Sequence, residues 1–600
     1  MLSFDFTPGR RVQCGWRSRY RPPRGGSTIT NWRGSMSLTL SLADLGPLQS
    51  ELARTRSSLS ENRIAARIVE RDHTVWKPDP TEISNRLGWL DSPATLLSQL
   101  PGIETFVDAA RSDGLTHALL LGMGGSSLAP EVFRRLFGVS AGYLDLAVLD
   151  STDPVAIANA TRDLDPARTL FIAATKSGGT VETLSLTKYC YGLAVAAVGR
   201  EQAGQQFVAI TDPGSGLADL AAELGFRHTF LNDPDIGGRY AALSCFGMVP
   251  ARLCGIDVER LLTLSVEAVK DIVDDGVGLS LGAVMGAAAL AGRNKLTFVT
   301  SPTLSPVGVW IEQLIAESTG KEGKGILPVD GEPLTSPDAY GSDRLFVRMR
   351  MSGEQHEDAA VRALVDAAQP VADLQFDDVH DVGAAMFTWE VATIVASHLL
   401  LINPFDQPDV EAAKILARSM MEAYRAQGQL PEQTPVLETE GIAVYGDVEA
   451  DSLAGVLRRF LADADDGAYL SLQAYVPSAA ETDAALTAIR QQIRSGWRLA
   501  TSAGYGPRYL HSTGQLHKGD DGAGLFLQIT CDHTTDLDIP DEPGGDTSAV
   551  SFGTLIAAQA LGDQQALLEG GRQVLRLHLG TDIVAGLKTI TDALGVAHQT

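Results

Sequence analysis

The sequence predicts an α/β protein built from doubly wound parallel sheets, and two observations support this fold class. From Thr116 onward, short apolar runs typical of buried strands alternate with segments of helical periodicity. The strand-like runs cover residues 118–121, 144–149, 170–174 and 207–210, and a second such unit starts with a run at 296–300. Because strands and helices in alternation imply right-handed crossovers, the strands of each unit are expected to be parallel. Ligands of such sheets bind beyond the carboxyl ends of the strands, so those loops are the candidate sites.

Periodicity and composition divide the 600 residues into five segments. Residues 1–35 hold seven arginines among prolines and glycines, and a segment of this composition cannot bury a core, so we predict disorder. Met36 opens the ordinary-looking chain, which favours translation from that residue. Helical spacing predicts a helical lead-in over 36–115, α/β domains over 116–290 and 291–430, and an additional α/β segment over 431–600. No internal repeat is visible.

Composition also bounds the partners and the compartment. The net charge of −26 repels phosphate backbones and acidic lipids, so neither nucleic acid nor a membrane is expected as a partner. This charge does not oppose a small phosphorylated substrate, whose site needs only local positive potential. The five cysteines are odd in number and lack CxxC spacing, which fits a reducing cytoplasm and no structural zinc. No apolar run reaches the roughly 18 residues that a membrane helix needs.

The first loop with a chemical signature follows the strand-like run 118–121. Gly122, Gly124 and Gly125 turn the chain into a helical segment, and such a turn leaves backbone N–H groups unpaired at the helix start. With the hydroxyl of Ser126 beside them, these donors would suit a phosphate. Glycines also occur in strand-to-helix turns that bind no ligand, so this loop alone does not decide the function.

A second loop of this kind, Thr175–Thr180, follows the third strand-like run at the same end of the sheet. Its candidate phosphate ligands are Thr175, Lys176, Ser177 and Thr180. Thr180 is also a plausible N-cap for the next helix. The alternative is a dinucleotide site, in which Gly122-x-Gly124 would bind the pyrophosphate and Asp150 the ribose. Two such loops that converge on one site favour phosphate binding instead. A dehydrogenase is disfavoured because Ser127 stands at the third glycine position of the dinucleotide fingerprint.

Later segments add groups suited to acid–base chemistry. Arg239, after two glycines, supplies a fixed cation with several donors. Gln313 and Glu317 lie four residues apart, on one face of a predicted helix. His398 lies inside an apolar run and is better explained as a core histidine. In the C-terminal segment, a polar loop over 505–519 is dense in groups that titrate or donate, namely Arg508, His511, His517 and Lys518.

Five motifs in this order resemble the glucose-6-phosphate isomerase family, whose members have two sugar-isomerase domains. The resemblance covers roughly residues 116–425. Its matches are Gly122–Pro130 with GIGGSxLGP, Thr175–Thr183 with SKTxxTxET, Gly238–Tyr240 with GGRYS, Gln313–Lys321 with QxxxESxGK and Phe405–Lys414 with FDQxGVExxK. The family's histidine between the last two motifs has no recognisable counterpart; instead, Ser512–His517 resembles the family's histidine loop. The C-terminal part resembles the isomerase half of bacterial transaldolase fusions, but no stretch before Thr116 could hold a transaldolase barrel.

This resemblance implies an isomerase that interconverts glucose 6-phosphate and fructose 6-phosphate through an enediolate, without metal or organic cofactor. It implies Glu317 as the proton-transfer base and Arg239 as the cation that stabilises the oxyanion. Lys414 and His517 are expected to open the sugar ring, with His511 as the competing assignment. The residues implied for substrate and phosphate binding are Gly125, Ser126, Thr175, Lys176, Ser177, Thr180, Gly238, Gln313 and Gln407. A homodimer in the cytoplasm is also implied.

Two other functions stay open at this point. A non-catalytic sugar-phosphate regulator would need the phosphate loops but not Glu317, Arg239 and Lys414 together. An isomerase of another sugar phosphate, such as mannose 6-phosphate, would carry the same groups, and the sequence does not separate these substrates.

Overall fold

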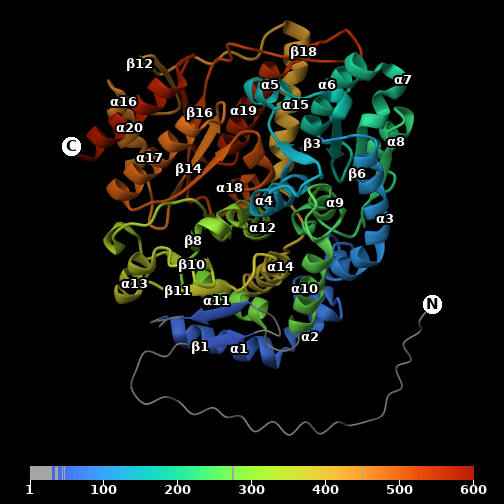
Figure 1. The fold of residues 1–600 in the computed structure, drawn as a ribbon. Coiled ribbons are helices and arrows are strands. Elements are labelled where there is room, and N and C mark those ends of the chain that lie inside the picture. Colours follow the sequence, from blue (N-terminus) through green and yellow to red (C-terminus); the bar gives the residue numbers. More distant parts are fainter. Residues whose placement is uncertain are drawn as a thin grey trace, which may run out of the picture.

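Three mainly parallel sheets with helices on their faces form the protein (Figure 1). The computed structural model describes residues 30–33, 38–42, 45, 48–272, 276–448 and 450–599. In Figure 1 the first sheet lies at the upper right, the second at the lower left and the third at the upper left. The α/β fold class predicted from alternating strands and helices is confirmed.

The first sheet has five parallel strands. Their spatial order is β4 (Asp145–Leu149), β3 (His117–Gly122), β5 (Thr169–Ala174), β6 (Phe207–Thr211) and β7 (His228–Leu231). β5 and β6 are buried along their whole length, as expected of strands with helices on both faces. The helices between and after the strands are α4 (Leu128–Phe137), α5 (Pro154–Thr161), α6 (Val181–Val198), α7 (Arg200–Ala203) and α8 (Gly216–Glu223). The four predicted strands are present, and β7 was missed because only one of its residues is buried.

The second sheet mixes parallel and antiparallel strands. Its spatial order is β1 (Thr30–Arg33), β2 (Thr39–Leu42), β11 (Val371–Phe376), β10 (Arg344–Met351), β8 (Lys295–Thr300) and β9 (Leu327–Val329). β8 to β11 are parallel, whereas β2 pairs antiparallel with β11 and β1 pairs antiparallel with β2. The helices that precede, separate or follow these strands are α9 (Cys245–Leu253), α10 (Val258–Asp271), α11 (Val277–Leu290), α12 (Gly308–Thr319), α13 (Asp358–Asp366) and α14 (Asp381–Leu399). In the sequence, all strands of the first sheet thus lie between β2 and β8 of the second sheet.

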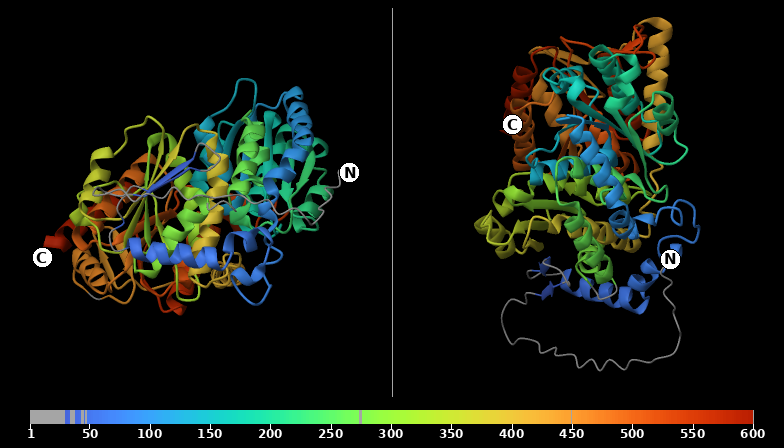
Figure 2. Two further views of the ribbon diagram at one scale, coloured as in Figure 1. Left: turned by 90° about the horizontal axis from the view of Figure 1, so that it is seen from below. Right: turned by 45° about the vertical axis from the view of Figure 1, so that its right-hand side comes forward.

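The N-terminal part differs from the prediction in two places. The lead-in contains strand β2 as well as the helices α1 (Leu48–Glu61), α2 (Ile64–Val69) and α3 (Ser92–Ser112). Strand β1 falls within residues 1–35, which were predicted to be disordered; the rest of that segment and Met36 lie outside the described residues. An edge strand is ordered by backbone hydrogen bonds to its neighbour rather than by a core of its own, so composition did not predict it. Figure 2 shows this hairpin on the outside of the second sheet, remote from the third.

The third sheet is built from the C-terminal segment. Its spatial order is β12 (Leu437–Thr439), β13 (Ile442–Tyr445), β19 (Gln573–His578), β16 (Gly524–Thr530), β14 (Tyr469–Tyr475) and β15 (Ala500–Tyr505). The helices of this part are α16 (Leu453–Ala462), α17 (Ala480–Trp497), α18 (Gly514–Gly519), α19 (Phe552–Glu569) and α20 (Ile583–Gln599), reached through α15 (Val410–Gln427). A small ribbon, β17 (Asp538–Ile539) with β18 (Val550–Ser551), precedes α19.

The second and third sheets share one topology. In the second sheet the parallel strands lie side by side in the order β9, β8, β10 and β11. In the third sheet the corresponding order is β15, β14, β16 and β19. In both sheets, therefore, the first of these strands in the sequence lies between the second and the third, and the fourth lies beside the third. An antiparallel pair from earlier in the chain extends each sheet beyond the fourth strand. The C-terminal segment is therefore a structural repeat of the second sheet, which no repeated string of residues revealed.

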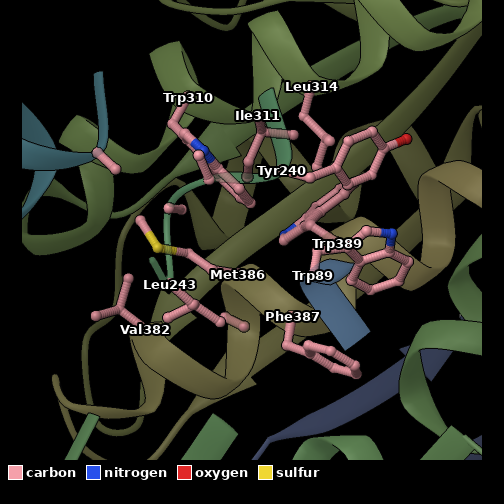
Figure 3. Close-up of a cluster of buried hydrophobic side chains, with 14 of the residues drawn as sticks. Trp89, Tyr240, Leu243, Trp310, Ile311, Leu314, Val382, Met386, Phe387 and Trp389 are labelled. Atoms are coloured by element: carbon pink, nitrogen blue, oxygen red, sulfur yellow. The ribbon is translucent and has the colours of Figure 1, made fainter. Parts of the chain in front are cut away.

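A buried cluster of aromatic and aliphatic side chains fixes the orientation of α12. Trp310, Ile311 and Leu314 project from one face of α12 toward Tyr240 and residues of α14 (Figure 3). α14 is the one helix in the described part of the chain that is long and apolar enough to span a membrane, and 89% of its most apolar window is buried inside the protein. Because the cluster occupies one face of α12, the neighbouring face carries Gln313 and Glu317 toward the site.

Candidate active site

Three tight turns from three parts of the chain meet at the candidate site. They are the 3₁₀ turns Gly124–Ser126, Gly238–Tyr240 and Arg508–His511. A Cβ added to Gly125 would lie 2.0 Å from the carbonyl oxygen of Gly238, and one added to Gly124 would lie 2.7 Å from that of His511. Only glycine permits these two approaches, so the first glycine loop brings the arginine turn and the histidine turn together.

The N–H groups of this glycine loop are only partly free, contrary to the expectation from sequence. The N–H of Ser126 donates to the carbonyl of Met123 at 3.1 Å, and that of Ser127 donates to Gly124 at 2.9 Å. The loop therefore closes on itself as a 3₁₀ turn, which satisfies two of the donors that were expected to face a phosphate.

Arg239 is the most completely bound side chain of the site and is only 2% exposed. Nε donates to Ser318 Oγ at 2.9 Å, and Nη2 donates to the carbonyls of Pro404 at 2.6 Å and Asp406 at 2.9 Å. Nη1 donates to Gln407 Oε1 at 3.0 Å and lies 3.1 Å from Oε1 of Glu317. Arg239 is thus a cation in a fixed position that joins α12 to the loop after α14.

Glu317 is held from its other side by Gln313. Nε2 of Gln313 lies 3.2 Å from Oε2 of Glu317 and 2.8 Å from the carbonyl oxygen of His511, and it donates to both. The carboxylate of Glu317 is therefore fixed between an amide and a guanidinium while its side chain stays 17% exposed. The prediction that these two residues share one helical face is consistent with this contact.

The loop Thr175–Thr180 lies at the start of α6, as the strand-to-helix alternation predicted. Oγ1 of Thr180 bonds to Oγ1 of Thr175 at 2.8 Å, so Thr180 stands at the N-cap position without capping the helix through its side chain. Lys176 forms an ion pair with Asp212 and donates to the carbonyl of Pro234 at 2.8 Å. The N-terminal N–H groups of α6 and the hydroxyl of Ser177 are consequently the anion-binding elements that this loop offers.

A cavity of about 830 Å³ opens beside this loop. It lies between α6 and α15 and is also lined by α19 and the β17–β18 ribbon. Its polar lining includes Ser177, Thr180, Glu182, Lys188, Lys414, Arg418, His511 and Gln559. Lys414 projects from α15 with its side chain 47% exposed, 3.6 Å from Glu411. Thus the predicted phosphate loop and the predicted lysine share one cavity, and Gln313 connects Glu317 to the backbone of His511, which lines it.

The two candidate histidines occupy very different places. His517 is fully buried; its Nε2 lies 3.2 Å from Ser471 Oγ, and its ring packs between the rings of Tyr469, Tyr509 and Phe526. Burial, together with the nearby charges of Lys518 and Arg572, places the pKa of His517 well below its usual value. The structure therefore places His517 in the core of the third sheet, outside the lining of the cavity.

His511, by contrast, lines the cavity and contacts a buried carboxylate. Its Nε2 lies 3.0 Å from Oε1 of Glu182, whose side chain is 4% exposed. Burial raises the pKa of Glu182, but the charge and hydrogen bond of His511 outweigh burial and leave this pKa below its usual value. Because a carboxylate only accepts, Nε2 of His511 carries the proton and Nδ1 is the basic nitrogen.

Two further functional groups were not proposed as site residues from the sequence. Glu182 lies within the motif Thr175–Thr183, and its pairing with a residue 329 positions later leaves no local signal. Lys321 entered the sequence analysis only as the last residue of the motif Gln313–Lys321. It is 1% exposed and pairs with Asp406 at 2.8 Å, and burial and the charge of Arg239 lower its pKa to about 8. It fixes the loop whose carbonyls bind Arg239.

Comparisons of sequence relate the chain to named enzymes. A sequence model of the family described as phosphoglucose isomerase matches residues 105–270. A glucose-6-phosphate isomerase of Rubrobacter xylanophilus is 30% identical over 418 residues, which cover 58% of this chain and 94% of that protein. A probable glucose-6-phosphate isomerase of Haloarcula marismortui is 26% identical, with 58% of this chain and 86% of that protein covered.

Comparisons of structure support the fold. A crystal structure of a glucose-6-phosphate isomerase from Chlamydia trachomatis superposes with a TM-score of 0.55 at 17% identity and covers 66% of this chain and 90% of that one. A hypothetical protein from Thermus thermophilus superposes with a TM-score of 0.54 at 24% identity and covers 66% and 100%.

Proposed function

The chain belongs to the glucose-6-phosphate isomerase family and interconverts glucose 6-phosphate and fructose 6-phosphate, and we propose that Glu317 is the base that carries the proton between C2 and C1. The observation that carries this assignment is the contact of the Glu317 carboxylate with the guanidinium of Arg239 at 3.1 Å. A base beside a buried cation can take a proton from carbon while the cation stabilises the negative charge that develops on oxygen.

The proton transfer divides into two steps in the open-chain sugar. Glu317 removes the C2 proton of the aldose, which leaves an enediolate with its charge on oxygen. The hydroxyl proton on O2 moves to O1 and the proton on Glu317 returns to C1, which gives the ketose with its carbonyl at C2. Nε, Nη1 and Nη2 of Arg239 all donate to protein acceptors, and Nη1 also forms an ion pair with Glu317, so Arg239 acts through its fixed positive charge and needs no reorganisation during the reaction.

Phosphate binding is assigned to the start of α6. Ser177 and Thr180 line the cavity at a helix N-terminus, where N–H groups and the helix dipole favour an anion. Thr175 orients the hydroxyl of Thr180, and Lys176 adds positive potential from its pair with Asp212. The sugar would lie between this phosphate position and Glu317. The other residues assigned to sugar binding lie near Glu317 and Arg239, and they are Gly125, Ser126, Gly238, Gln313 and Gln407.

Ring opening is assigned to His511 and Lys414 rather than to His517. Both side chains line the cavity that also holds the phosphate loop. The imidazole of His511 is held through Nε2 by Glu182, which leaves Nδ1 to take the proton from the anomeric hydroxyl. Lys414 would give a proton to the ring oxygen from the other wall.

Isomerisation in deuterium oxide tests the proton-transfer mechanism. Transfer by one carboxylate predicts that the product carries some deuterium at the carbon that receives the proton, because the protonated base exchanges with solvent. Product that contains no deuterium under any conditions would indicate a hydride shift and would remove the need for Glu317 as a base. The same assay with mannose 6-phosphate tests whether the site accepts the epimer.

The assignments involve a single copy of the chain. His511 and Gln559 come from the C-terminal repeat, and both bond to Glu182 at the start of α6 of the same chain. We expect the homodimer implied by the family. The cysteines Cys190, Cys245, Cys254 and Cys531 are unpaired and buried, which supports a reducing compartment such as the cytoplasm, where this reaction serves glycolysis and gluconeogenesis.

A further inference from the structure

A buried hydrogen-bonded chain links His511 to two elements that have no part in the proposed chemistry. Oε1 of Glu182 lies 3.0 Å from Nε2 of His511 and 2.7 Å from Nε2 of Gln559, and both nitrogens donate to it. The hydroxyl of Thr152 donates to Oε1 of Gln559 at 2.8 Å. Thr152, Gln559 and Glu182 are 0%, 3% and 3% exposed. These side chains are therefore almost closed to water, with only the small exposed parts of Glu182 and Gln559 reaching the cavity.

The four members come from separate parts of the fold. Thr152 lies in the loop after β4, Glu182 in the first turn of α6, His511 in the turn after β15 and Gln559 in the middle of α19. The hydrogen-bonded chain therefore crosses three times between the first sheet and the C-terminal repeat. No stretch of sequence brings these residues together, which is why Thr152 and Gln559 had no signal in the sequence.

The amide of Gln559 is held in one orientation by its two partners. Glu182 only accepts, so the NH₂ group of Gln559 must face it, and the carbonyl oxygen then receives the hydroxyl proton of Thr152. A rotated amide would place its oxygen against the carboxylate of Glu182. Thr152 thus fixes the amide, and the amide supplies Glu182 with a second donor besides His511.

We propose that Gln559 is a positioning residue of the isomerase, which holds Glu182 ionised and aimed at Nε2 of His511 so that Nδ1 faces the anomeric hydroxyl. This inference rests on the proposed role of His511 in ring opening. A buried carboxylate that loses a donor becomes harder to ionise. Once Glu182 is protonated, its attraction for the imidazole weakens and the tautomer with a basic Nδ1 is no longer favoured.

The pH dependence of ring opening follows from the groups around Glu182. The titratable or charged groups that face this carboxylate are His511 from the turn after β15, Lys414 from α15 and Tyr475 from β14. His511 and Lys414 favour the ionised form, and Gln559 adds the neutral donor. Removing that donor raises the pH at which Glu182 takes up a proton. The acid limb of kcat/KM therefore moves to higher pH in a variant without the donor.

The Gln559→Leu variant tests this positioning role. For glucose 6-phosphate we expect a loss of kcat/KM of roughly 10-fold or more, the usual cost of removing an outer partner of a functional histidine, and an acid limb displaced to higher pH. Proton exchange on an open-chain tetrose phosphate should be unchanged, because it needs no ring opening. Thr152→Val, which leaves Gln559 in place but frees its amide, should displace the acid limb in the same direction by less.

A matched control separates positioning from loss of a buried amide. Gln564 lies on the same helix and is also 3% exposed, but its buried Oε1 has no hydrogen-bond partner. Gln564→Leu should leave the pH profile where it is in the wild type. If Gln559→Leu does not fold, Thr152→Val decides the question by its acid limb alone.

The outcomes distinguish this inference from the proposed function. One outcome overturns the positioning role of Gln559 and leaves the role of His511 intact. In that outcome, the acid limb is unchanged in Gln559→Leu and in Thr152→Val, while His511→Ala has a ring-opening defect. A His511→Ala variant that turns over the cyclic sugar normally overturns the proposed role of His511, and the positioning role with it. A displaced acid limb in Gln559→Leu with none in Gln564→Leu supports the proposal.

Discussion

Oε1 of Glu317 lies 3.1 Å from Nη1 of Arg239, and this pair joins two segments 78 positions apart in the chain. The base comes from α12, whose apolar face is fixed by the cluster in Figure 3. The cation comes from a turn that packs against the first glycine loop through Gly125. The relative position of proton acceptor and positive charge is therefore set by buried packing on both sides.

Replacing Arg239 with lysine should impair catalysis and stability together. Lysine keeps the charge but not the five donors, so the carbonyls of Pro404 and Asp406 lose donors in a buried place. We expect kcat to fall by roughly 10² to 10³, the usual cost of an oxyanion-stabilising group. Unfolding should become easier by about 1–3 kcal/mol. Steady-state kinetics with denaturant unfolding would measure both; wild-type kcat in a folded variant would contradict the role of Arg239.

Alanine variants of the two histidines should behave differently on cyclic and open-chain sugars. His511→Ala should slow turnover of glucose 6-phosphate by roughly 10²-fold or more and spare exchange on an open-chain tetrose phosphate. His517→Ala should lower thermal stability, because the ring is fully buried among three aromatic rings, with a smaller effect on rate. If the ring-opening defect appeared in His517→Ala instead, the original choice from sequence would be restored.

The contrast between these histidines shows what the sequence could not supply. Both lie within one polar loop, and only the fold shows that α18 carries His517 into the core while the preceding turn carries His511 into the cavity. Local periodicity was sufficient for β3, β5 and the pairing of Gln313 with Glu317, because those features depend on residues a few positions apart. The link from Glu182 to His511 and Gln559, the β1–β2 hairpin and the repeated topology depend on long-range packing, which no local pattern encodes.

Glu390 should make the protein less stable as the pH rises. It is 1% exposed in the core helix α14, Oε1 has no hydrogen-bond partner, and burial raises its pKa well above the usual value. Above about pH 4.5 the unfolded chain has lost this proton while the folded protein keeps it, so folding takes up a proton and stability falls with pH. Within that window the contribution changes by up to about 1.4 kcal/mol per pH unit.

The Glu390→Met variant removes this effect. Its free energy of unfolding, relative to that of the wild type, should rise steadily from pH 5 to pH 7 because only the wild type carries the buried acid. Denaturant titrations at several pH values would measure the difference. A difference that stays constant over this range would show that Glu390 ionises equally in both states.

Removal of residues 1–35 should leave the activity intact and lower the melting temperature slightly. The deletion takes away β1, whose backbone pairs with β2 at the outer edge of the second sheet. β2 itself, with Leu40 and Leu42 buried, keeps its pairing with β11. Thermal unfolding and steady-state kinetics of the shortened chain would check this, and a large loss of kcat would show that the edge hairpin contributes to the site.

Glu317→Gln tests the central assignment most directly. The amide has nearly the same shape as the carboxylate but cannot accept the proton, so the loss should appear in kcat, with sugar-phosphate binding nearly intact. The measurement is the rate of C2 proton exchange with solvent in bound glucose 6-phosphate, followed by NMR in deuterium oxide beside a binding titration of the same variant. We predict exchange below detection with near wild-type affinity; exchange at a substantial fraction of the wild-type rate would rule out Glu317 as the base.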